Sequence, residues 1–420
     1  MSLKPVLNRL GIPDYEEIFA PDWDIIQESL PTEGVFFLKP RYVRWACEAV
    51  YLPKEMTQAL LAASGRIMAD EALSALAWYC HYRLFRSRGE VEIRRWPLLT
   101  KALGREAGMF YVLILLSGTP QMQRVHRERG IPAYIVRDTV LDLKHCMETE
   151  EYHRRFGSWG ISPRILNWLM NHWRGELYRL GRLQFVPSRF QGRLRAFRHR
   201  RRGTVIALSE EGVRYRLDGQ IDGAGGIYDP NAWDATLEVG EKEIVGYPIS
   251  PLGYAIRRRI HLSTSEWRQV LAPGDPVLAI HIPGGSPLSF ELCGHSLRQA
   301  LQFFPKHFPD RPFLAFTCHS WILDHQFEHL LPPSSNIVRF QKEVYLYPIP
   351  GGNESVMRAV FGGVKDIKDA PRRTSMQRAF ARHLESGGHF RGGGCFLLKE
   401  DLNWGGQVYR QFGRKEGLET

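Results

Sequence analysis

The segment from Val277 to Pro309, with the sequence VLAIHIPGGSPLSFELCGHSLRQALQFFPKHFP, constrains the fold more than any other part of the chain. Its start, VLAIHI, is almost entirely apolar, which is typical of a β-strand covered on both faces. A turn containing Gly284 and Gly285 follows, and apolar residues then recur at helical spacing. The segment therefore predicts a strand, a glycine turn and an amphipathic helix, with His281 near the end of the strand.

This turn has the features of an anion-binding site. Ser286 can cap the helix and Pro287 can occupy its first turn. Backbone N–H groups at the start of such a helix point into the turn, and the two glycines let a ligand approach them closely. The pyrophosphate of coenzyme A is one candidate ligand. The alternative is a turn that only connects the two elements.

The rest of the chain predicts two domains. Aromatic and aliphatic residues at helical spacing, among strong helix formers, indicate a mostly helical domain over residues 1–178. Short segments rich in β-forming residues follow, so we place a second domain over residues 179–420. Around the central segment we expect a helix over 263–271, a strand and a helix over 312–332, and a long strand over 335–349. This alternation predicts an α/β (α+β) fold with a mixed sheet.

Charge and composition point to an anionic partner. The 420 residues include 56 Lys and Arg against 45 Asp and Glu, a formal net charge of +11. Nucleic acid, anionic lipid and phosphorylated cofactors all fit this excess, and a solvated basic surface is the alternative. The segment RFQGRLRAFRHRRRG over 189–203 fits either nucleic acid or a hairpin with arginines on its exposed face, and we favour the hairpin.

Cysteine spacing and hydropathy predict a cytoplasmic protein. The six cysteines lie far apart without a Cys-x-x-Cys motif, so we expect reduced thiols and no metal site. The N-terminus lacks the apolar core of a signal peptide. The apolar run over 107–118 is about half as long as a bilayer requires, so we expect a buried helix there and no transmembrane segment.

Several blocks of sequence together resemble a bacterial acyltransferase family that has a helical N-terminal domain and a GNAT-like C-terminal domain. The blocks are LGRLQF at 180–185, HIPGGSPL at 281–288, CGHSLRQALQFF at 293–304, CHSWILD at 318–324, SNIVRFQ at 335–341, and TSMQRAF with the following GG over 374–388. In the GNAT fold the fourth and fifth strands splay apart and the coenzyme lies in the gap. VLAIHI is similar to the fourth strand and FLAFTC to the fifth.

The resemblance implies an enzyme that uses acetyl-CoA or a longer acyl-CoA as co-substrate. It places the coenzyme at Ile282, Gly284, Gly285, Ser286 and Ser296. It implies a small-molecule or peptide acceptor, covered by the helical domain. The usual GNAT phosphate signature, Arg/Gln-x-x-Gly-x-Gly/Ala, is replaced here by PGGSPLS. An acyl carrier protein is therefore an alternative donor.

Three residues are candidates for the chemistry. His281 at the strand end can act as the general base that takes a proton from an amine, because histidine titrates near neutral pH. Asp324 could orient a histidine or bind a cationic amine, or it could cap the following helix. Cys318 could be an acyl-accepting nucleophile. The alternatives for His281 and Cys318 are a structural histidine and a buried thiol.

Three further residues are candidate substrate contacts. His319 and Trp321 follow the next strand, and the carboxyl ends of strands are where open α/β sheets bind ligands. Asn336 could contact the substrate or form a turn. The sequence thus predicts an acyltransferase in which an amine, or less favourably a hydroxyl, attacks an acyl thioester directly. The alternative is a non-catalytic protein of the same fold that binds an acylated ligand or nucleic acid.

Overall fold

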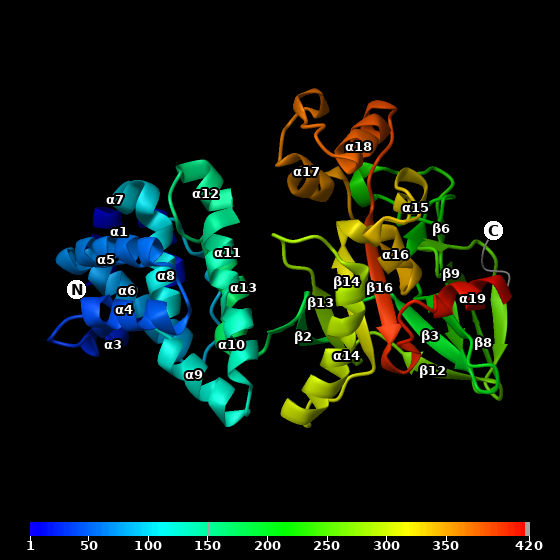
Figure 1. Cartoon of the computed structure of the whole chain (residues 1–420), viewed down its shortest axis with the longest axis horizontal. Coiled ribbons are helices and arrows are strands. Elements are labelled where there is room, and N and C mark those ends of the chain that lie inside the picture. Colours follow the sequence, from blue (N-terminus) through cyan, green and yellow to red (C-terminus); the bar gives the residue numbers. More distant parts are fainter. Residues whose placement is uncertain (150, 416–420) are drawn as a thin grey trace. The chain divides into compact units, whose positions relative to one another are not determined.

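The structure is a computed structural model that describes residues 1–149 and 151–415. The chain divides into two compact units, Met1–Leu180 and Gly181–Thr420. The first unit is helical, and the second contains nearly all of the β-structure (Figure 1). Among the described residues, no helix is both long enough and apolar enough to cross a membrane.

Unit 1 is built around one large apolar core. Its helices are α1 (Leu3–Leu10), α2 (Glu16–Phe19), α3 (Trp23–Glu28), α4 (Pro40–Ala49), α5 (Lys54–Ala69), α6 (Glu71–Phe85), α7 (Thr100–Leu103), α8 (Ala107–Leu116), α9 (Thr119–Glu128), α10 (Ala133–Val140), α11 (Asp142–Thr149), α12 (Glu151–Phe156) and α13 (Pro163–Trp173). Every residue of α8 is buried. The apolar run over 107–118 is therefore the central helix of this core. The short strand β1 (Tyr178–Leu180) ends the unit.

A mixed sheet forms the centre of unit 2. Its strands follow the order β2 (Leu183–Arg189), β13 (Pro276–His281), β14 (Ala315–Ser320), β16 (Gly392–Leu398) and β15 (Tyr345–Ile349). β13 is antiparallel to β2 and parallel to β14, whereas β16 is antiparallel to both of its neighbours. The carboxyl ends of β13, β14 and β15 therefore lie at one edge of the sheet.

Helices and further strands cover the main sheet. The helix α14 (Phe290–His307) packs on one face, where Phe304 contacts the ring of Phe185 on β2 (Figure 1). A second sheet has the order β10 (Tyr254–Ala255), β9 (Pro248–Ser250), β4 (Val205–Ser209), β3 (Leu194–His199) and β12 (Trp267–Leu271). It packs on the opposite face, where the Tyr345 hydroxyl donates to the Ile249 carbonyl at 2.5 Å.

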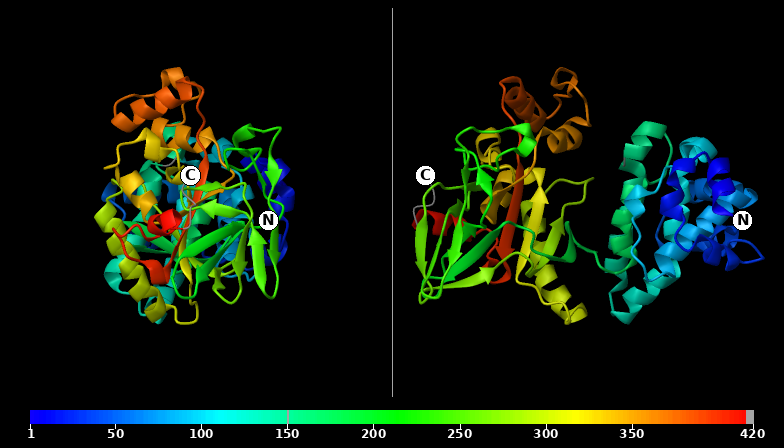
Figure 2. Two further views of the ribbon diagram at one scale, coloured as in Figure 1. Left: turned by 90° about the vertical axis from the view of Figure 1, so that its right-hand side faces the viewer. Right: turned by 180° about the vertical axis from the view of Figure 1, so that it is seen from behind.

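Smaller elements complete unit 2. They are the three-stranded sheet β11 (Ile260–Ser263), β8 (Glu243–Gly246) and β7 (Leu237–Val239), the pair β5 (Arg214–Tyr215) and β6 (Trp233–Asp234), and the helices α15 (Phe327–Leu330), α16 (Asn336–Lys342), α17 (Asn353–Phe361), α18 (Ser375–Glu385) and α19 (Val408–Lys415). α17 and α18 form a lobe between β15 and β16, so they project from the edge at which β13 and β14 end (Figure 2). The arginine-rich segment 189–203 continues into the hairpin of β3 and β4, as predicted.

Two predictions of local structure were wrong. The segment over 263–271 contains the last residue of β11, a turn and strand β12 rather than a helix. Trp267 and its neighbours pair with β3, and this pairing overrides the helical pattern. The long strand predicted over 335–349 is helix α16 followed by the short strand β15. Val338 and Phe340 of α16 are buried, so packing decides this helix as well. The predicted fold class of a helical domain followed by a mixed sheet is confirmed.

Candidate active site

The central strands of the main sheet separate at their carboxyl ends. β13 pairs with β14 at Val277–Ala315, Leu278–Phe316 and Ala279–Thr317, and the pairing ends there. β13 continues to pair with β2 as far as His281, and β14 continues to pair with β16 as far as Ser320. The last residues of β13 and β14 are thus held by their outer neighbours and not by each other.

The predicted glycine turn leads away from this opening. Gly284, Gly285 and Ser286 are exposed, and Gly285 has a φ of 81°, a left-handed conformation that favours glycine. Arg182 fixes the far end of the turn. Its guanidinium donates to the carbonyl oxygens of Ser286 and Pro287, each at 2.9 Å. The backbone around the glycines is therefore accessible and anchored.

The predicted role of Ser286 as a helix cap is wrong. Helix α14 begins at Phe290, and the hydroxyl of Ser289 accepts a hydrogen bond from the backbone N–H of Leu292 at 3.4 Å. Ser286 instead gives its carbonyl oxygen to Arg182. The glycines consequently lie several residues before the helix and not at its first turn.

Ser296, a predicted contact of the coenzyme, is buried, and its hydroxyl forms hydrogen bonds only within the protein. It is 0% exposed, and its hydroxyl accepts from the backbone N–H groups of Arg182 at 2.9 Å and Leu183 at 3.3 Å while donating to the Leu292 carbonyl at 2.9 Å. These bonds join α14 to the start of β2. Ser296 therefore connects two elements of the fold and offers no hydroxyl group to a ligand. Ile282 is half-buried at the start of the turn.

Two histidines lie at the ends of the separating strands. Side chains alternate along a strand, so His281 and His319 lie on the same face as the last paired residues, Ala279 and Thr317. His281 pairs in register with Gln184 on β2. Gln184 is 2% exposed, and its Nε2 has no hydrogen-bond partner among the described residues. A buried N–H donor of this kind is expected to find an acceptor, and a ligand can supply one.

His319 has a partner that the sequence did not reveal. Its Nε2 lies 2.8 Å from the hydroxyl of Tyr347 on β15. The two residues flank Gly394 on β16, and a Cβ on Gly394 would lie 2.3 Å from the Tyr347 ring. Only a residue without a side chain lets the tyrosine reach the histidine. The sequence signal was the run Gly392–Gly394, whose meaning depends on the sheet order.

The protonation of this pair follows from its surroundings. Burial raises the pKa of Tyr347 well above its ordinary value, so its hydroxyl keeps the proton. The end of β14 leaves His319 exposed on one side, but the neighbouring strands bury the other side and lower its pKa. We assign the proton of the neutral imidazole to Nδ1, the tautomer in which Nε2 accepts from the Tyr347 hydroxyl.

Asp324 lies in a separate, fully satisfied network. Its carboxylate accepts from the backbone N–H of Arg391 at 2.8 Å and from both the backbone and the side chain of Gln326 at 3.1 Å. The side chain is 0% exposed, and burial is the main cause of its raised pKa. These bonds cap the turn before α15 and tie it to the segment before β16. This is the capping role that the sequence left open, and no bond leads from Asp324 to His281 or His319 in the described residues.

His325 belongs to the same network as Asp324. Its Nε2 lies 3.1 Å from Nη1 of Arg391, whose Nη2 donates to Asp218 at 2.8 Å. Burial and the nearby Arg391 lower the pKa of His325 to about 4. The imidazole is therefore neutral near pH 7 and accepts from Arg391.

The other predicted site residues, Cys318, Trp321 and Asn336, take part in the packing and secondary structure of unit 2. Cys318 is 5% exposed, and burial raises the pKa of its thiol to about 12, so it stays protonated at neutral pH. Trp321 is half-buried and contacts the ring of Phe327 in the cluster beneath α17 and α18. Asn336 is the first residue of α16 rather than part of a turn. In the described residues no group of His, Cys, Asp and Glu side chains could hold a metal ion.

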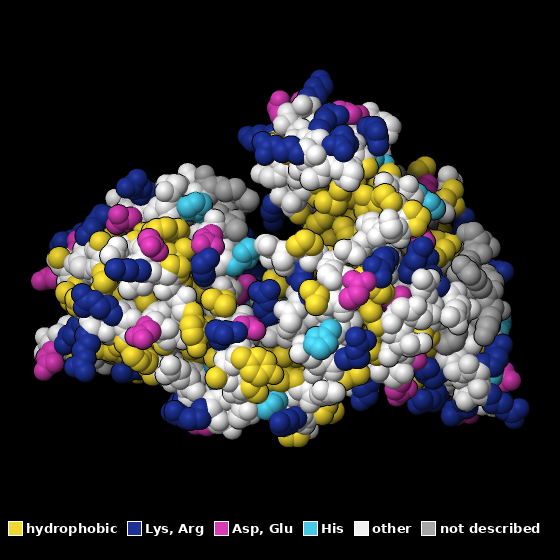
Figure 3. All heavy atoms as spheres, in the orientation of Figure 1, with side chains coloured by type: hydrophobic (Ala, Val, Ile, Leu, Met, Phe, Trp, Pro, Cys, Tyr) yellow, Lys and Arg dark blue, Asp and Glu magenta, His cyan; other side chains and the backbone are white. Residues whose placement is uncertain are grey.

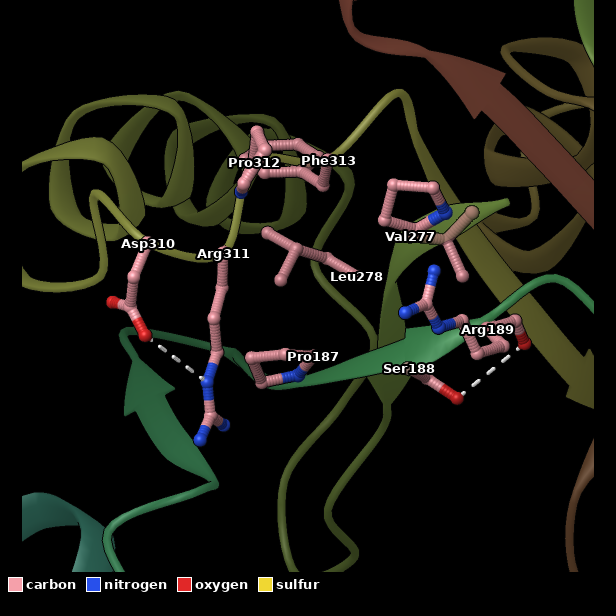
Figure 4. A pocket seen from close by; sticks show the side chains of 10 residues that line it. Pro187, Ser188, Arg189, Val277, Leu278, Asp310, Arg311, Pro312 and Phe313 are labelled. Carbon is pink, nitrogen blue, oxygen red and sulfur yellow. Dashed lines mark hydrogen bonds and ion pairs between the residues drawn. The ribbon is translucent and has the colours of Figure 1, made fainter. Parts of the chain in front are cut away.

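A cavity of about 440 Å³ lies at the amino end of β13, away from these histidines. Figure 4 shows its lining side chains, which include Pro187, Leu278 and Phe313 with Arg189 and Arg311 nearby. Val277 and Ala315 are still paired at this end of the sheet. None of the predicted site residues contributes to this cavity.

Comparisons with known proteins identify the family. Residues 177–397 match the GNAT-like C-terminal domain, and residues 43–175 match the N-acyltransferase N-terminal domain. The first match alone covers more than half of the chain. The chain belongs to the family of the GNAT-like C-terminal domain. The predicted acyltransferase class and the predicted two-domain architecture are confirmed.

Solved structures agree with this family. An acyltransferase in complex with decanoyl-CoA and teicoplanin is 24% identical, with a TM-score of 0.65 over 95% of this chain and 99% of the other. An acyltransferase in complex with CoA and 10C-teicoplanin is 23% identical, with a TM-score of 0.64 over the same shares. These likenesses show the fold. A search of curated proteins found no match.

Proposed function

We propose that this GNAT-like protein transfers an acyl group from acyl-coenzyme A to an amine of a small-molecule or peptide acceptor, with a hydroxyl as the less favoured acceptor. The observation that carries the proposal is the end of the β13–β14 pairing at Ala279–Thr317, while both strands remain held by their outer neighbours. In a continuous parallel sheet the pairing would extend to the strand ends. The family and the acyl-CoA complexes of the similar structures support the same conclusion.

The donor would lie along the end of β13. A pantetheine arm carries two amide groups that can bond to strand backbone at Ile280, where the pairing with β14 has ended. Buried Gln184 offers a further N–H donor on the neighbouring strand. The exposed backbone around Gly284 and Gly285 would then receive the pyrophosphate. Ile282 and Ser286 would contribute backbone contacts only.

We assign the general base to His281 and a polarising role to His319. The acceptor nitrogen attacks the thioester carbonyl carbon while His281 takes its proton. His319, with Nε2 bonded to Tyr347, would present its Nδ1–H to the carbonyl oxygen as negative charge develops there. The carbon–sulfur bond then breaks, and the proton held by His281 passes to the departing thiolate. Tyr347 acts as a positioning residue because it fixes the tautomer of His319.

Direct attack is favoured over an acyl-enzyme intermediate. The most conspicuous thiol at the site, Cys318, is buried and protonated, because its pKa is raised to about 12. A thiol in that state is a poor nucleophile. Cys318 and Asp324 are therefore not among the proposed catalytic groups. Trp321 and Asn336 are proposed contacts of the acceptor substrate. The helical unit would set the specificity for the acceptor.

The thiols support a cytoplasmic location. All six cysteines are free and buried, as in proteins of a reducing compartment.

An acyl carrier protein is a second candidate donor. Basic side chains gather on the α17–α18 lobe next to the proposed donor site (Figure 3). Carrier proteins that bind such surfaces are acidic, so charge complementarity supports this alternative.

The first experiment is titration of the protein with CoA, acetyl-CoA and longer acyl-CoAs by calorimetry, together with a Gly285→Ala variant. Alanine at Gly285 strains a left-handed backbone and places a Cβ where the pyrophosphate would approach, so CoA affinity should fall about tenfold. Gly274→Ala is the matched control, because Gly274 has a φ of 88° and open space around it. Absence of heat with every thioester would contradict the proposal. Turnover with a carrier-bound thioester alone would favour the alternative donor.

A non-catalytic binding role is the competing function. It predicts binding of an acylated ligand, or of nucleic acid with a steep salt dependence, and no release of free thiol with any acceptor amine. A thiol-release assay over a panel of amines distinguishes the two functions, because only the enzyme consumes the thioester.

A further inference from the structure

The helical unit contains a second cavity that shares no residue with the proposed donor site. Its volume is about 360 Å³, within the range of small-molecule sites. It lies where the 3-10 turns Pro13–Tyr15 and Ile93–Arg95 meet the end of α12 and the start of α13. Six side chains define its chemistry: Tyr15, Arg94, Trp96, Arg155, Phe156 and Arg164.

The charged side chains that line this cavity are all positive among the described residues. Arg94, Arg155 and Arg164 line it, and no Asp or Glu is among its lining residues in the part of the chain that the structure describes. Neighbouring Arg95 has a carboxylate partner, since its Nη1 lies 2.6 Å from Glu92. Arg94 and Arg155 have no such ion pair among the described residues. The guanidinium groups of Arg94 and Arg155 repel each other in this cavity, and an anion between them removes the repulsion.

The walls of the cavity are planar and fixed. Trp96 is 5% exposed, and its ring lies against Phe19 at 6.3 Å and against Tyr111 at 6.2 Å between centroids. The guanidinium of Arg155 lies 5.1 Å from the centre of the Phe156 ring. A rigid aromatic wall next to guanidinium groups suits a ligand with a flat part and a negative part.

We propose that this cavity binds a planar organic anion, in which a carboxylate or a phosphate is attached to an aromatic ring or amide. The guanidinium groups would hold the anion through paired N–H donors, a geometry that arginine provides and lysine does not. Trp96 would contact the flat part. Two sources supply this chemistry, an acidic peptide-like molecule and a nucleotide.

The test is calorimetric titration of the full-length protein with hippurate and with adenosine 3′-phosphate, and with their neutral counterparts hippuramide and adenosine. Arg94→Gln and Arg155→Gln remove one charge each from exposed positions that make no described ion pair, so both variants should fold. Arg127→Gln, on an exposed position of α9 outside the cavity, is the matched control.

We expect at least one anion to bind the unchanged protein and each cavity variant to bind it about tenfold more weakly, with no change in the control. Only binding that the cavity variants weaken is assigned to this cavity, because coenzyme A carries an adenosine 3′-phosphate group and the proposed donor site would bind it as well. Such binding of hippurate alone would identify the carboxylate source, and such binding of adenosine 3′-phosphate alone the nucleotide. Binding that both cavity variants leave unchanged would contradict the proposal. The proposal fails if neither anion binds at millimolar concentration, or if the neutral counterparts bind equally well. The readout is independent of acyl transfer, so the outcome stands whether or not the proposed function holds.

Discussion

The end of β14 and the turn that follows it hold polar side chains with opposite properties. His319 lies at the exposed end of β14, beyond the last residue that pairs with β13, and its Nε2 lies 2.8 Å from the hydroxyl of Tyr347. Asp324 and His325 lie in a buried network in which the donors and acceptors of Arg391, Gln326 and the backbone satisfy them. The position of a histidine or a carboxylate at a strand end thus does not by itself predict a catalytic role. What matters is whether its hydrogen-bonding capacity is already used.

The largest expected effect comes from removing the exposed histidine. His319→Ala should lower the rate of acyl transfer by about 10²–10³-fold, because the thioester oxygen loses its polarising donor. Stability to urea should change little, since the side chain is exposed. Steady-state kinetics with the best acyl-CoA checks the rate, and His261→Ala, another exposed histidine, is the control. An unchanged rate in His319→Ala would remove this residue from the mechanism.

Asp324→Ala should show the reverse pattern. The substitution leaves the backbone N–H groups of Arg391 and Gln326 without this acceptor and removes one bond of the Gln326 side chain, which still donates to the His389 carbonyl. The free energy of unfolding should therefore fall by about 3 kcal/mol. The rate per folded molecule should stay within about twofold of the unchanged protein. Urea unfolding measures the first quantity. Asp310→Ala, at an exposed carboxylate, should alter stability by less than about 0.5 kcal/mol. A stable but inactive Asp324→Ala protein would restore the catalytic role considered from the sequence.

Acid should weaken the buried network through His325. Its pKa is about 4 in the folded protein and about 6.5 when unfolded, so the unfolded state binds more protons between these values. Stability should therefore fall by up to about 3 kcal/mol as the pH drops from about 6.5 to about 4. Asp324 opposes this trend because its raised pKa favours the folded state in acid. Comparing the pH dependence of urea midpoints for the unchanged protein and His325→Gln isolates the histidine. Parallel curves would show that His325 is not buried as described.

A smaller effect is expected at the glycine that separates His319 from its partner. Gly394→Ala would place a Cβ 2.3 Å from the Tyr347 ring, which must move and lose its bond to His319. We expect a loss of about 1–3 kcal/mol in stability together with a slower rate. Tyr347→Phe removes only the hydroxyl, so it should slow the reaction without a comparable loss of stability. The ¹⁵N shifts of the His319 imidazole should report the same tautomer change in both variants. Unchanged shifts in Tyr347→Phe would contradict the positioning role.

The smallest effect is expected at Cys318. Its protonated, buried thiol should resist iodoacetamide in the folded protein, and Cys318→Ala should keep the rate while losing about 1 kcal/mol of stability. Mass spectrometry after brief alkylation checks the reactivity of the thiol, and steady-state kinetics and urea unfolding of Cys318→Ala check the rate and the stability. Mass spectrometry of the unchanged protein after quenched acyl transfer looks for a covalent intermediate. An acyl group found covalently attached to this cysteine would show that the reaction proceeds through an acyl-enzyme.

Much of the architecture followed from local patterns. The apolar strand at β13, the glycine turn, the amphipathic helix α14 and the helical first unit all depend on periodicity and on residues with strong preferences, which act over a few neighbours. The segment 263–271 shows the limit. It contains helix-compatible residues, but its pairing with β3 across a large sequence distance made it a strand. The cap of α14 shifted from Ser286 to Ser289 for a similar reason, since Arg182 engages the Ser286 carbonyl.

The sequence by itself determined the family, the two-domain layout of element types, and the placement of His281 and His319 at strand ends. Only the tertiary structure decided which polar groups remain available. The bond between His319 and Tyr347 requires β15 and β14 to flank Gly394, and the burial of Asp324 requires the segment before β16 to return beside it. Such contacts join residues far apart in the chain, so they depend on sheet order and packing, which no local pattern encodes.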